Sequence, residues 1–390
     1  MDVNALRSQI PATQKMVYLN TGWSGPSPIS VVQAITRFVE EEAYDGPTTP
    51  AVQEKARAVK LQARQAVAGL IDASVDEVLL TQNTTHGLNV VLSGLPWKHG
   101  DEVITFDLEH GSVLLPALNL QRRYGVKTIV LPLAPDEEHD SIVKKVEAAI
   151  TARTRMVFMS HIQYASGLRM PAERIRKLTK PRGIWMLLDG AQTPGHIALD
   201  MRALDVEFYA MPGQKWLLGP DGIGALYIRK DAIPLVDPAH VGHSLFPKYE
   251  ELGELVPAAD QITKFNLSSS SAPYAAGLAA GVAFIQQAGK HEVEERNRGL
   301  GMLAKKRLAD IPGVSVCSTL APEASTGLVT FSIAGADPDA AVKLLWERHR
   351  IMARQVRNPK GLRLSLDFFN TEQELEQVFS AVERLATARL

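Results

Sequence analysis

Residues 185–228, WMLLDGAQTPGHIALDMRALDVEFYAMPGQKWLLGPDGIGALYI, contain two short apolar runs that each lead to a polar side chain. The first run, Trp185–Leu188, is followed by Asp189, and the second, Glu207–Met211, leads through Pro-Gly-Gln to Lys215. Short, continuous apolar runs are typical of strands that are buried on both faces of a parallel sheet. Because ligands bind at the carboxyl ends of such strands, we expect Asp189 and Lys215 to lie at the same edge of a sheet.

Further apolar runs alternate with helical periodicity around these residues. The predicted strands are 77–80, 103–106, 127–131, 156–160, 184–188, 207–211 and 225–228, and the predicted helices are 29–44, 51–70, 85–94, 112–124, 138–150 and 171–179. This alternation predicts an α/β fold in which helices flank a mostly parallel sheet. The last two strands are joined by glycine-rich chain instead of a helix, so we expect the last one to be an antiparallel edge strand.

The C-terminal part of the chain has a different pattern, and 390 residues exceed what one small core accommodates. Helices are predicted at 275–287, 290–310, 338–348 and 372–386, and strands at 314–318, 327–333 and 362–366. Thr371 and Glu374 form a capping-box pattern at the start of the last helix. We therefore expect a smaller C-terminal α+β domain, with the large domain at 20–270 and the small domain formed by 1–19 together with 271–390.

The composition is that of an ordinary globular protein and argues against several classes of function. The 42 Lys and Arg residues nearly balance the 43 Asp and Glu residues, which predicts no nucleic-acid partner and no membrane partner. The single cysteine excludes an intrachain disulfide framework, and we expect no metal site. The N-terminus lacks the apolar core of a signal peptide, and no apolar run reaches the ~18 residues of a membrane span, so we expect a cytoplasmic protein.

Asp189 and Lys215 have the chemistry that pyridoxal phosphate requires. This cofactor needs an amine with which to form a Schiff base and a carboxylate that keeps its ring nitrogen protonated. Lys215 is followed by apolar residues, which makes it a candidate for a lowered pKa. Each residue also has a simpler interpretation, because a buried aspartate can pair with a structural arginine and a lone lysine is usually exposed.

Thr84 and Thr85 follow a predicted strand and begin a predicted helix in the motif TQNTTHGLN. Free N–H groups and two hydroxyls at the start of a helix can bind an anion, although helix capping by Thr84 is the favoured interpretation. The chain has no Walker motif and no G-x-G-x-x-G fingerprint, so a phosphate bound here need not belong to a nucleotide.

Three further polar residues and one loop are candidates on weaker grounds. His110 could stack on a planar ring, Gln192 could donate to a ring oxygen, and Arg363 could hold a carboxylate. The competing interpretations are a structural histidine, a solvated glutamine and a surface salt bridge. The loop Asn20–Pro28 contains two glycines, which favours a simple turn over a close approach to another part of the molecule.

Taken together and in order, these motifs resemble the class V aminotransferase family, whose members are pyridoxal-phosphate enzymes of fold type I. The family includes cysteine desulfurases, isopenicillin-N epimerase-like proteins and cysteine or cystine C–S lyases. The resemblance covers nearly the whole chain and rests on YLNTGWSGPSP, TQNTTHGLN, GDEVITFDLEH, SHIQYASG, DGAQTPGH, GQKWLLGPDGIGALYI, KFNLSSSS and GLRLSLDFFNTEQELE. The ordered set is specific to the family, although no single motif is.

The resemblance implies a role for each candidate residue. Lys215 would hold the cofactor covalently and move the Cα proton of the substrate, Asp189 would pair with the pyridine nitrogen, and Arg363 would bind the substrate carboxylate. The other cofactor-binding residues would be Thr84 and Thr85 at the phosphate, His110 on the ring, Gln192 at the phenolic oxygen, Gln214, and Ser269, which would reach the phosphate of the neighbouring subunit in a homodimer. The pocket for the substrate side chain would include Trp23, Tyr164 and His243.

The chain departs from the family pattern at positions that bear on the reaction. Relatives usually have Ser-Gly-His before the lysine, where this chain has Pro212-Gly213-Gln214, and Ala165 stands where an asparagine is usual. Segment 353–360 lacks the cysteine that desulfurases carry before the arginine strand. The only thiol, Cys317, lies in a predicted strand of the small domain, where we expect it to be part of the core.

These departures favour a C–S β-lyase that acts on cysteine, cystine or a cysteine S-conjugate and releases a thiol or persulfide, pyruvate and ammonia. An epimerase, an aminotransferase or a decarboxylating deaminase of a biosynthetic amino-acid intermediate is the alternative, because the same lysine and arginine serve all of them. A cysteine desulfurase is disfavoured by the missing loop cysteine. A non-catalytic cofactor sensor is disfavoured because the chain has no spare basic segment for DNA binding.

Overall fold

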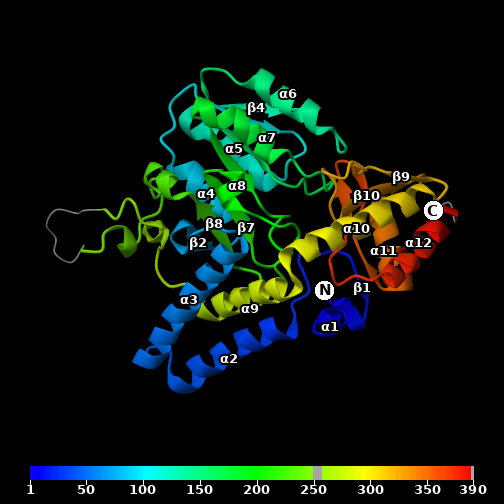
Figure 1. Cartoon of the computed structure of the whole chain (residues 1–390), viewed down its shortest axis with the longest axis horizontal. Coiled ribbons are helices and arrows are strands. Elements are labelled where there is room, and N and C mark those ends of the chain that lie inside the picture. The colour runs from blue at the N-terminus through cyan, green and yellow to red at the C-terminus, as the bar shows by residue number, and fades with distance from the viewer. Residues whose placement is uncertain (249–256, 388–390) are drawn as a thin grey trace.

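The computed structural model describes residues 1–248 and 257–387. Its main feature is a sheet of seven strands in the order β2-β8-β7-β6-β5-β3-β4 (Figure 1). The strands are β2 (Val78–Thr81), β3 (Glu102–Phe106), β4 (Lys127–Leu131), β5 (Thr154–Ser160), β6 (Trp185–Asp189), β7 (Phe208–Pro212) and β8 (Gly224–Ile228). Each corresponds to a predicted strand, with small differences at the ends.

The sheet is mostly parallel, as predicted. Strands β3 to β7 pair in parallel, whereas β8 is antiparallel to both of its neighbours, β7 and β2. The expectation that β8 is an edge strand is wrong, because β2 pairs along its outer side, from Val78 opposite Tyr227 to Thr81 opposite Gly224. All five residues of β8 are buried, which agrees with this interior position.

Helices cover both faces of the large sheet, as the predicted α/β architecture requires. They are α2 (Ile29–Asp45), α3 (Pro50–Leu70), α4 (Thr84–Gly94), α5 (Gly111–Tyr124), α6 (His139–Ala149), α7 (Ala172–Thr179), α8 (Met201–Leu204) and α9 (Ala272–Ala288). Leu187 packs into the core shared with α4 and α5, and Leu188 packs into the core shared with α3, α6, α7 and α9. Because successive residues enter opposite cores, β6 is apolar throughout.

A smaller antiparallel sheet of four strands, in the order β12-β13-β10-β9, follows in the chain. Its strands are β9 (Val314–Val316), β10 (Leu328–Ile333), β12 (Arg354–Arg357) and β13 (Lys360–Ser365), and its helices are α10 (Lys290–Ala309), α11 (Pro338–His349) and α12 (Glu372–Thr387). Near the N-terminus, β1 (Val17–Tyr18) pairs in parallel with β11 (Ile351–Met352). The predicted capping box at the start of α12 is confirmed, because Thr371 and Glu374 each accept the other's backbone N–H.

Helix α9 lies beside α2 and α3 at the bottom of Figure 1. Its Leu278, Val282 and Ile285 belong to the core of the large sheet, whereas Leu300 and Ala304 of the next helix, α10, belong to the core of the small sheet. The division into 20–270 and 1–19 with 271–390 stays a prediction.

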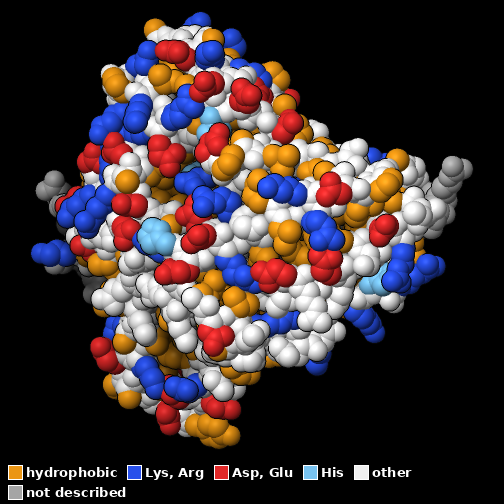
Figure 2. Space-filling view, turned by 45° about the vertical axis from the view of Figure 1, so that its right-hand side comes forward, with side chains coloured by type: hydrophobic (Ala, Val, Ile, Leu, Met, Phe, Trp, Pro, Cys, Tyr) orange, Lys and Arg blue, Asp and Glu red, His pale blue; other side chains and the backbone are white. Residues whose placement is uncertain are grey.

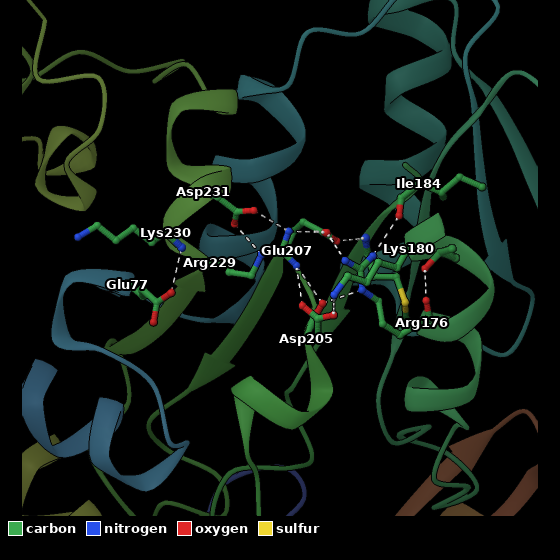
Figure 3. Close-up of polar contacts among 11 residues, drawn as sticks. Glu77, Arg176, Lys180, Ile184, Asp205, Glu207, Arg229, Lys230 and Asp231 are labelled. Carbon is green, nitrogen blue, oxygen red and sulfur yellow. Dashed lines mark hydrogen bonds and ion pairs between the residues drawn. The ribbon is translucent and has the colours of Figure 1, made fainter. Parts of the chain in front are cut away.

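The amino ends of β6 and β7 carry a buried ion network (Figure 3). Glu207, just before β7, accepts from Arg176 of α7 at 2.6 Å and lies 3.0 Å from the Arg229 guanidinium. Its second oxygen accepts the N–H of Met186 in β6 at 2.9 Å. This network ties the two central strands together at the edge opposite Asp189 and Lys215.

Acidic and basic side chains are interspersed over the face shown in Figure 2, in keeping with the nearly balanced charge. Among the helices that the structure describes, none combines the length and apolar character needed to cross a bilayer.

Candidate active site

Asp189 and Lys215 lie at the carboxyl ends of the neighbouring parallel strands β6 and β7. Asp189 is buried, and its Oδ1 accepts the N–H of Ala191 at 2.7 Å. Burial raises the pKa of Asp189, and the positive charge of Lys215 opposes this rise. Burial lowers the pKa of Lys215 to about 8 although Asp189 raises it, and Arg363 and Arg354 lower it further. The two groups are electrostatically coupled, and the amine is partly unprotonated near neutral pH.

The loop Asn20–Pro28 crosses this edge of the sheet at very close range. A Cβ atom on Gly25 would lie 2.3 Å from the carbonyl oxygen of Lys215, and one on Gly22 would lie 3.0 Å from Arg363 Nη2. The N–H of Gly25 donates to the carbonyl of Gln214 at 2.7 Å. The interpretation of this loop as a simple turn is therefore wrong, because close approach to the site is what excludes side chains at both glycines.

Gln192 follows β6 and is held at both ends of its amide. Its Oε1 accepts from Trp216 Nε1 at 2.8 Å, and its Nε2 donates to the carbonyl of Gly22 at 2.9 Å. His196 stacks on Trp216, and its Nε2 accepts the N–H of Gly327, so its Nδ1 carries the proton that is donated to the Gln192 carbonyl. Burial lowers the pKa of His196 to about 3, which keeps the imidazole neutral. The second amide hydrogen of Gln192 stays available for a ligand.

Two helix starts meet at the far end of the site. His110 caps α5, where its Nδ1 accepts the N–H of Ser112 at 3.1 Å. The hydroxyl of Thr85 at the start of α4 donates to the Ser112 hydroxyl at 2.8 Å and joins the two helices. The predicted cap of α4 by Thr84 is wrong, because Asn83 accepts the N–H of His86 and Thr84 is the first helical residue. The N–H groups of Thr84 and Thr85 are not used by this cap, and as the first N–H groups of a helix they suit an anion.

Arg363 lies on β13 and is fully buried. Its Nη1 donates to the carbonyl of Tyr164 at 2.7 Å, whereas its Nε and Nη2 have no partner. Burial lowers the pKa of Arg363 to about 9, and Arg354 lowers it further. Within the described residues Arg363 forms no ion pair, so the competing interpretation as a surface salt bridge is wrong. A free guanidinium edge of this kind fits a carboxylate.

Tyr164 and Trp23 line the same region. The ring of Tyr164 packs edge-on against His110, with ring centroids 5.0 Å apart. Trp23 is 57% exposed, and the guanidinium of Arg354 lies over its ring at 4.4 Å. Desolvation lowers the pKa of His110, and the positive charges of Lys215, Arg354 and Arg363 lower it further.

Sequence reasoning missed Arg354 and Glu109. Arg354 lies opposite Arg363 in the β12–β13 hairpin, and its buried Nε has no partner. Glu109 is buried beside Ser160, whose N–H it accepts at 2.9 Å, and it also accepts from Gln163 Nε2 at 2.8 Å. Burial raises the pKa of Glu109 to about 7, and Asp189 raises it as well. The hairpin pairing would have revealed Arg354, but no pattern in the sequence indicates Glu109.

Three of the predicted site residues make fewer side-chain contacts with the residues around Lys215. Ser269 precedes α9 and is exposed, and His243 is exposed in the short helix His243–Leu245. In the part of the chain that the structure describes, neither side chain forms a hydrogen bond or ion pair with the Lys215 group. Gln214 precedes Lys215, and its buried amide oxygen has no partner.

The family model for class-V aminotransferases matches residues 17–378. The chain therefore belongs to the class V aminotransferase family. It is a pyridoxal-phosphate-dependent enzyme of fold type I, in agreement with the residues of the site and with the similar solved structures.

Several known proteins are similar over almost their full length. A probable cysteine desulfurase of Methanothermobacter thermautotrophicus is 29% identical over 99% of this chain and 98% of its own. The isopenicillin N epimerase of Streptomyces clavuligerus is 30% identical over 98% of both chains. The cystine C–S lyase C-DES, in complex with its reaction product cysteine persulfide, is 27% identical, with a TM-score of 0.90 over 96% of this chain and 99% of its own. A lysine-to-alanine variant of C-DES, with glycine covalently linked to its pyridoxal-phosphate cofactor, has a TM-score of 0.91 at 27% identity over 97% of this chain and 98% of its own.

The residues present fit the cofactor. An amine of lowered pKa lies beside a buried carboxylate, and two helix starts with free N–H groups lie at the same edge of the sheet. The buried polar atoms without partners include Gln214 Oε1 and the Nε and Nη2 atoms of Arg363. Buried groups of this kind require a partner, and a bound cofactor with an amino-acid substrate would supply it.

Proposed function

We propose that this enzyme is a C–S β-lyase that acts on cysteine, cystine or a cysteine S-conjugate and releases a thiol or persulfide, pyruvate and ammonia. The observation that carries the proposal is the position of the only cysteine. Cys317 directly follows β9, which is the opposite edge of the small sheet from β12, the strand of Arg354. A desulfurase route, in which an enzyme thiol beside the substrate takes the sulfur, therefore lacks its nucleophile.

Relatives support a sulfur-bearing substrate. Among them are cysteine desulfurases and the cystine C–S lyase C-DES. Their common chemistry breaks a bond to the sulfur of a cysteine derivative, which matches the proposed leaving group.

Pyridoxal phosphate, when bound, supplies the electron sink for negative charge that develops at the substrate Cα. We assign to Lys215 the role of the base that removes the proton from this carbon, because its pKa of about 8 leaves part of the amine unprotonated near neutral pH. The electron pair of the broken Cα–H bond then forms the Cα–Cβ double bond as the Cβ–S bond breaks, and sulfur leaves with its electrons. Hydrolysis of the released fragment gives pyruvate and ammonia.

Other residues would hold the cofactor in place. Asp189 would keep a proton on the ring nitrogen, and Gln192 would donate its remaining amide hydrogen to the ring oxygen. His110 would pack on the ring, with Tyr164 fixing its orientation from the side. Thr84, Thr85 and Gln214 would bind the phosphate, with the first-turn N–H groups of α4.

The positions of Arg363 and Arg354 suggest where the two ends of the substrate bind. The free Nε–Nη2 edge of Arg363 would bind the α-carboxylate in a bidentate manner. Arg354 is a second cation near Lys215, and its position over the exposed ring of Trp23 would suit a negative charge at the far end of the substrate. This arrangement favours cystine, which carries a second carboxylate, over cysteine itself. His243 stays a prediction for the pocket.

We also propose that the enzyme is a homodimer in which Ser269 reaches the phosphate of the neighbouring subunit. Ser269 is exposed and, within the described residues, makes no side-chain hydrogen bond in its own chain. Ile29, Val32 and Val39 form an exposed apolar stripe on α2 that a second copy could cover. Analytical ultracentrifugation of the cofactor-loaded protein tests this, and a fully active monomer would contradict it.

The test of the reaction is a product analysis. Cofactor-loaded protein is incubated with cysteine, cystine, S-methylcysteine and alanine, and pyruvate and the sulfur product are measured. We expect pyruvate only from the sulfur-bearing amino acids, with cystine the best, and an unchanged rate for the Cys317→Ser variant. Loss of activity in that variant would contradict the proposed lyase mechanism and support a cysteine desulfurase instead.

One other function has a specific observation in its favour, the 30% identity to an isopenicillin N epimerase. An epimerase uses the same lysine and cofactor but returns the proton to Cα. Loss of optical activity without pyruvate would establish this alternative, whereas a 2-oxo acid that retains the substrate side chain would indicate transamination.

A further inference from the structure

The turn Gln163–Leu168, which follows β5, adjoins the candidate active site. The turn is closed by the N–H of Gln163, which donates to the Leu168 carbonyl at 2.9 Å, and by the N–H of Gly167, which donates to the Gln163 carbonyl at 2.8 Å. It carries Tyr164, whose ring packs on His110, and its Gln163 side chain donates to Glu109. The position of this turn therefore sets the position of residues around Lys215.

Four consecutive carbonyl oxygens of the turn each accept a hydrogen bond from a side chain of the small sheet or the chain next to it. The pairs are Arg363 Nη1 with Tyr164 at 2.7 Å, Thr330 Oγ1 with Ala165 at 2.5 Å, Ser318 Oγ with Ser166 at 2.6 Å and Thr326 Oγ1 with Gly167 at 2.7 Å. All four donor residues are buried. The small sheet and the chain between β9 and β10 thus hold the backbone of the turn at every residue from Tyr164 to Gly167.

Thr330 has the central place in this set. It lies directly opposite Arg363 in the β10–β13 pair and has no exposed surface. Its backbone N–H donates to Ser318 Oγ at 2.8 Å, so it also fixes the hydroxyl that holds Ser166. Its own hydroxyl holds the carbonyl of Ala165, the neighbour of the carbonyl that binds Arg363.

The Tyr164 carbonyl decides which edge of the Arg363 guanidinium is free. It occupies Nη1 and leaves Nε and Nη2 without partners, and Nη2 faces the space above Gly22. Rotation of the peptide between Tyr164 and Ala165 would move this acceptor and turn the guanidinium away from that space. The hydrogen bond from Thr330 to the next carbonyl opposes such a rotation.

We propose that Thr330 is a positioning residue for amino-acid binding, whose hydroxyl holds the turn so that the Tyr164 carbonyl directs the free edge of Arg363 toward the substrate carboxylate. This inference rests on the proposed role of Arg363 as the carboxylate-binding residue. A purely structural role would make Thr330 and Thr326 act alike, because each buried hydroxyl holds one carbonyl of the same turn. A positioning role makes them differ, since only Thr330 adjoins the carbonyl that holds Arg363.

The experiment measures binding without turnover to product. Cofactor-loaded protein is titrated with glycine, which carries the α-carboxylate, and with methylamine, which lacks it, and the visible absorbance of the cofactor is followed. Thr330→Val should raise the apparent Kd for glycine by about three- to tenfold, the effect of one neutral hydrogen bond, and leave methylamine unchanged. Thr330→Ser keeps the hydroxyl and should restore glycine binding. Thr326→Val is the matched control and should lower Tm without changing the binding of either amine.

Equal weakening of glycine by Thr330→Val and Thr326→Val would overturn the proposal, as would equal weakening of glycine and methylamine by Thr330→Val or no effect on either. If Thr330→Val does not fold, Thr330→Ala is measured in the same way. Failure of the lyase proposal leaves this test intact, because no elimination product is measured. Failure of the carboxylate assignment shows itself separately, as an Arg363→Ala variant that still binds glycine like the unaltered protein, and it overturns the inference as well.

Discussion

Trp216 donates its Nε1–H to Gln192 Oε1 at 2.8 Å. Trp216 directly follows Lys215 in the chain, and through this bond it orients the Gln192 side chain, which lies just after β6. The same indole stacks on His196, with ring centroids 3.7 Å apart and an angle of 13° between the planes. His196 in turn donates to the Gln192 carbonyl at 2.8 Å. The backbone and the amide of Gln192 are therefore both fixed by one aromatic pair.

Replacing Trp216 by Phe removes the N–H donor and leaves the buried Gln192 Oε1 unpaired. We expect the affinity for pyridoxal phosphate to fall by roughly 1–2 kcal/mol, or about five- to thirtyfold, because the amide loses its orientation. Titration of the cofactor-free protein, followed by absorbance, measures this change. Trp185→Phe is the control, since that ring packs on Trp97 at the amino end of β6. Unchanged affinity in Trp216→Phe would show that Gln192 does not need this donor.

Lys215→Ala should abolish the absorbance near roughly 420 nm that a protonated Schiff base between the cofactor and a lysine gives. It should also abolish the covalent adduct that borohydride reduction leaves on the protein. Lys98→Ala, at an exposed lysine that precedes the amino end of β3, should change neither signal. A reducible adduct that persists in Lys215→Ala would place the Schiff base on another lysine.

Gly22→Ala should block the carboxylate site and displace the side chains that line it. Its Cβ would lie 2.8 Å from Ser365 Oγ and 3.0 Å from Arg363 Nη2, inside the space that the carboxylate is proposed to use. We expect kcat/KM to fall by at least about tenfold, which corresponds to ~1.4 kcal/mol, mainly through KM. Gly299→Ala, where no atom lies within 4 Å of the new Cβ, should leave kcat/KM unchanged. A normal KM in Gly22→Ala would exclude this space as the carboxylate site.

The sequence predicted the large sheet well because most of its strands are buried on both faces and therefore stand out as continuous apolar runs, the edge strand β4 being the exception. The juxtaposition of Asp189 and Lys215 followed from the same pattern, since both lie at the carboxyl ends of adjacent parallel strands. Strand β12 was missed because Arg354-Gln355-Val356-Arg357 is short and polar, and only its pairing with β13 makes it a strand. Without that strand, Arg354 has no predictable position beside Arg363.

Interactions between distant segments were the least predictable part of the site. The bond from Arg363 to the Tyr164 carbonyl spans 199 positions, and it determines which guanidinium edge is free. Local chemistry could mislead as well, because Asn83 and Thr84 are both good caps and only the backbone geometry decides between them. The two glycines of the loop Asn20–Pro28 likewise needed the opposing atoms to distinguish close approach from a turn.

Asp367 should make stability fall as the pH rises. This side chain is fully buried, its Oδ2 has no partner, and burial raises its pKa to about 8. The folded state therefore keeps a proton that the unfolded state releases above a pKa of about 4, and stability is lost between these two values by up to about 1.4 kcal/mol per pH unit. Above about pH 8 the loss is complete.

Asp367→Asn mimics the neutral acid and should remove this dependence. Denaturant unfolding of the variant and of the unaltered protein at several pH values should show a difference in the free energy of unfolding that grows from pH 5 to pH 8 and then stays level. A difference that is constant with pH would show that Asp367 is ionised in the folded protein.

The ion network at the opposite edge of the sheet predicts a loss of stability without loss of the site (Figure 3). Arg176 and Glu207 are each only 6% exposed, so Arg176→Met would leave Glu207 buried with Arg229 as its remaining cation. We expect the free energy of unfolding to fall by about 3 kcal/mol, the lower end of the range for a broken buried ion pair, while the cofactor absorbance stays unchanged. Arg174→Met on the same helix breaks an ion pair whose side chains are 46% and 70% exposed, and it should cost less than about 1 kcal/mol. Equal losses in the two variants would mean that the buried pair contributes no more than a surface pair, whereas a changed absorbance in Arg176→Met would mean that the two edges of the sheet are coupled.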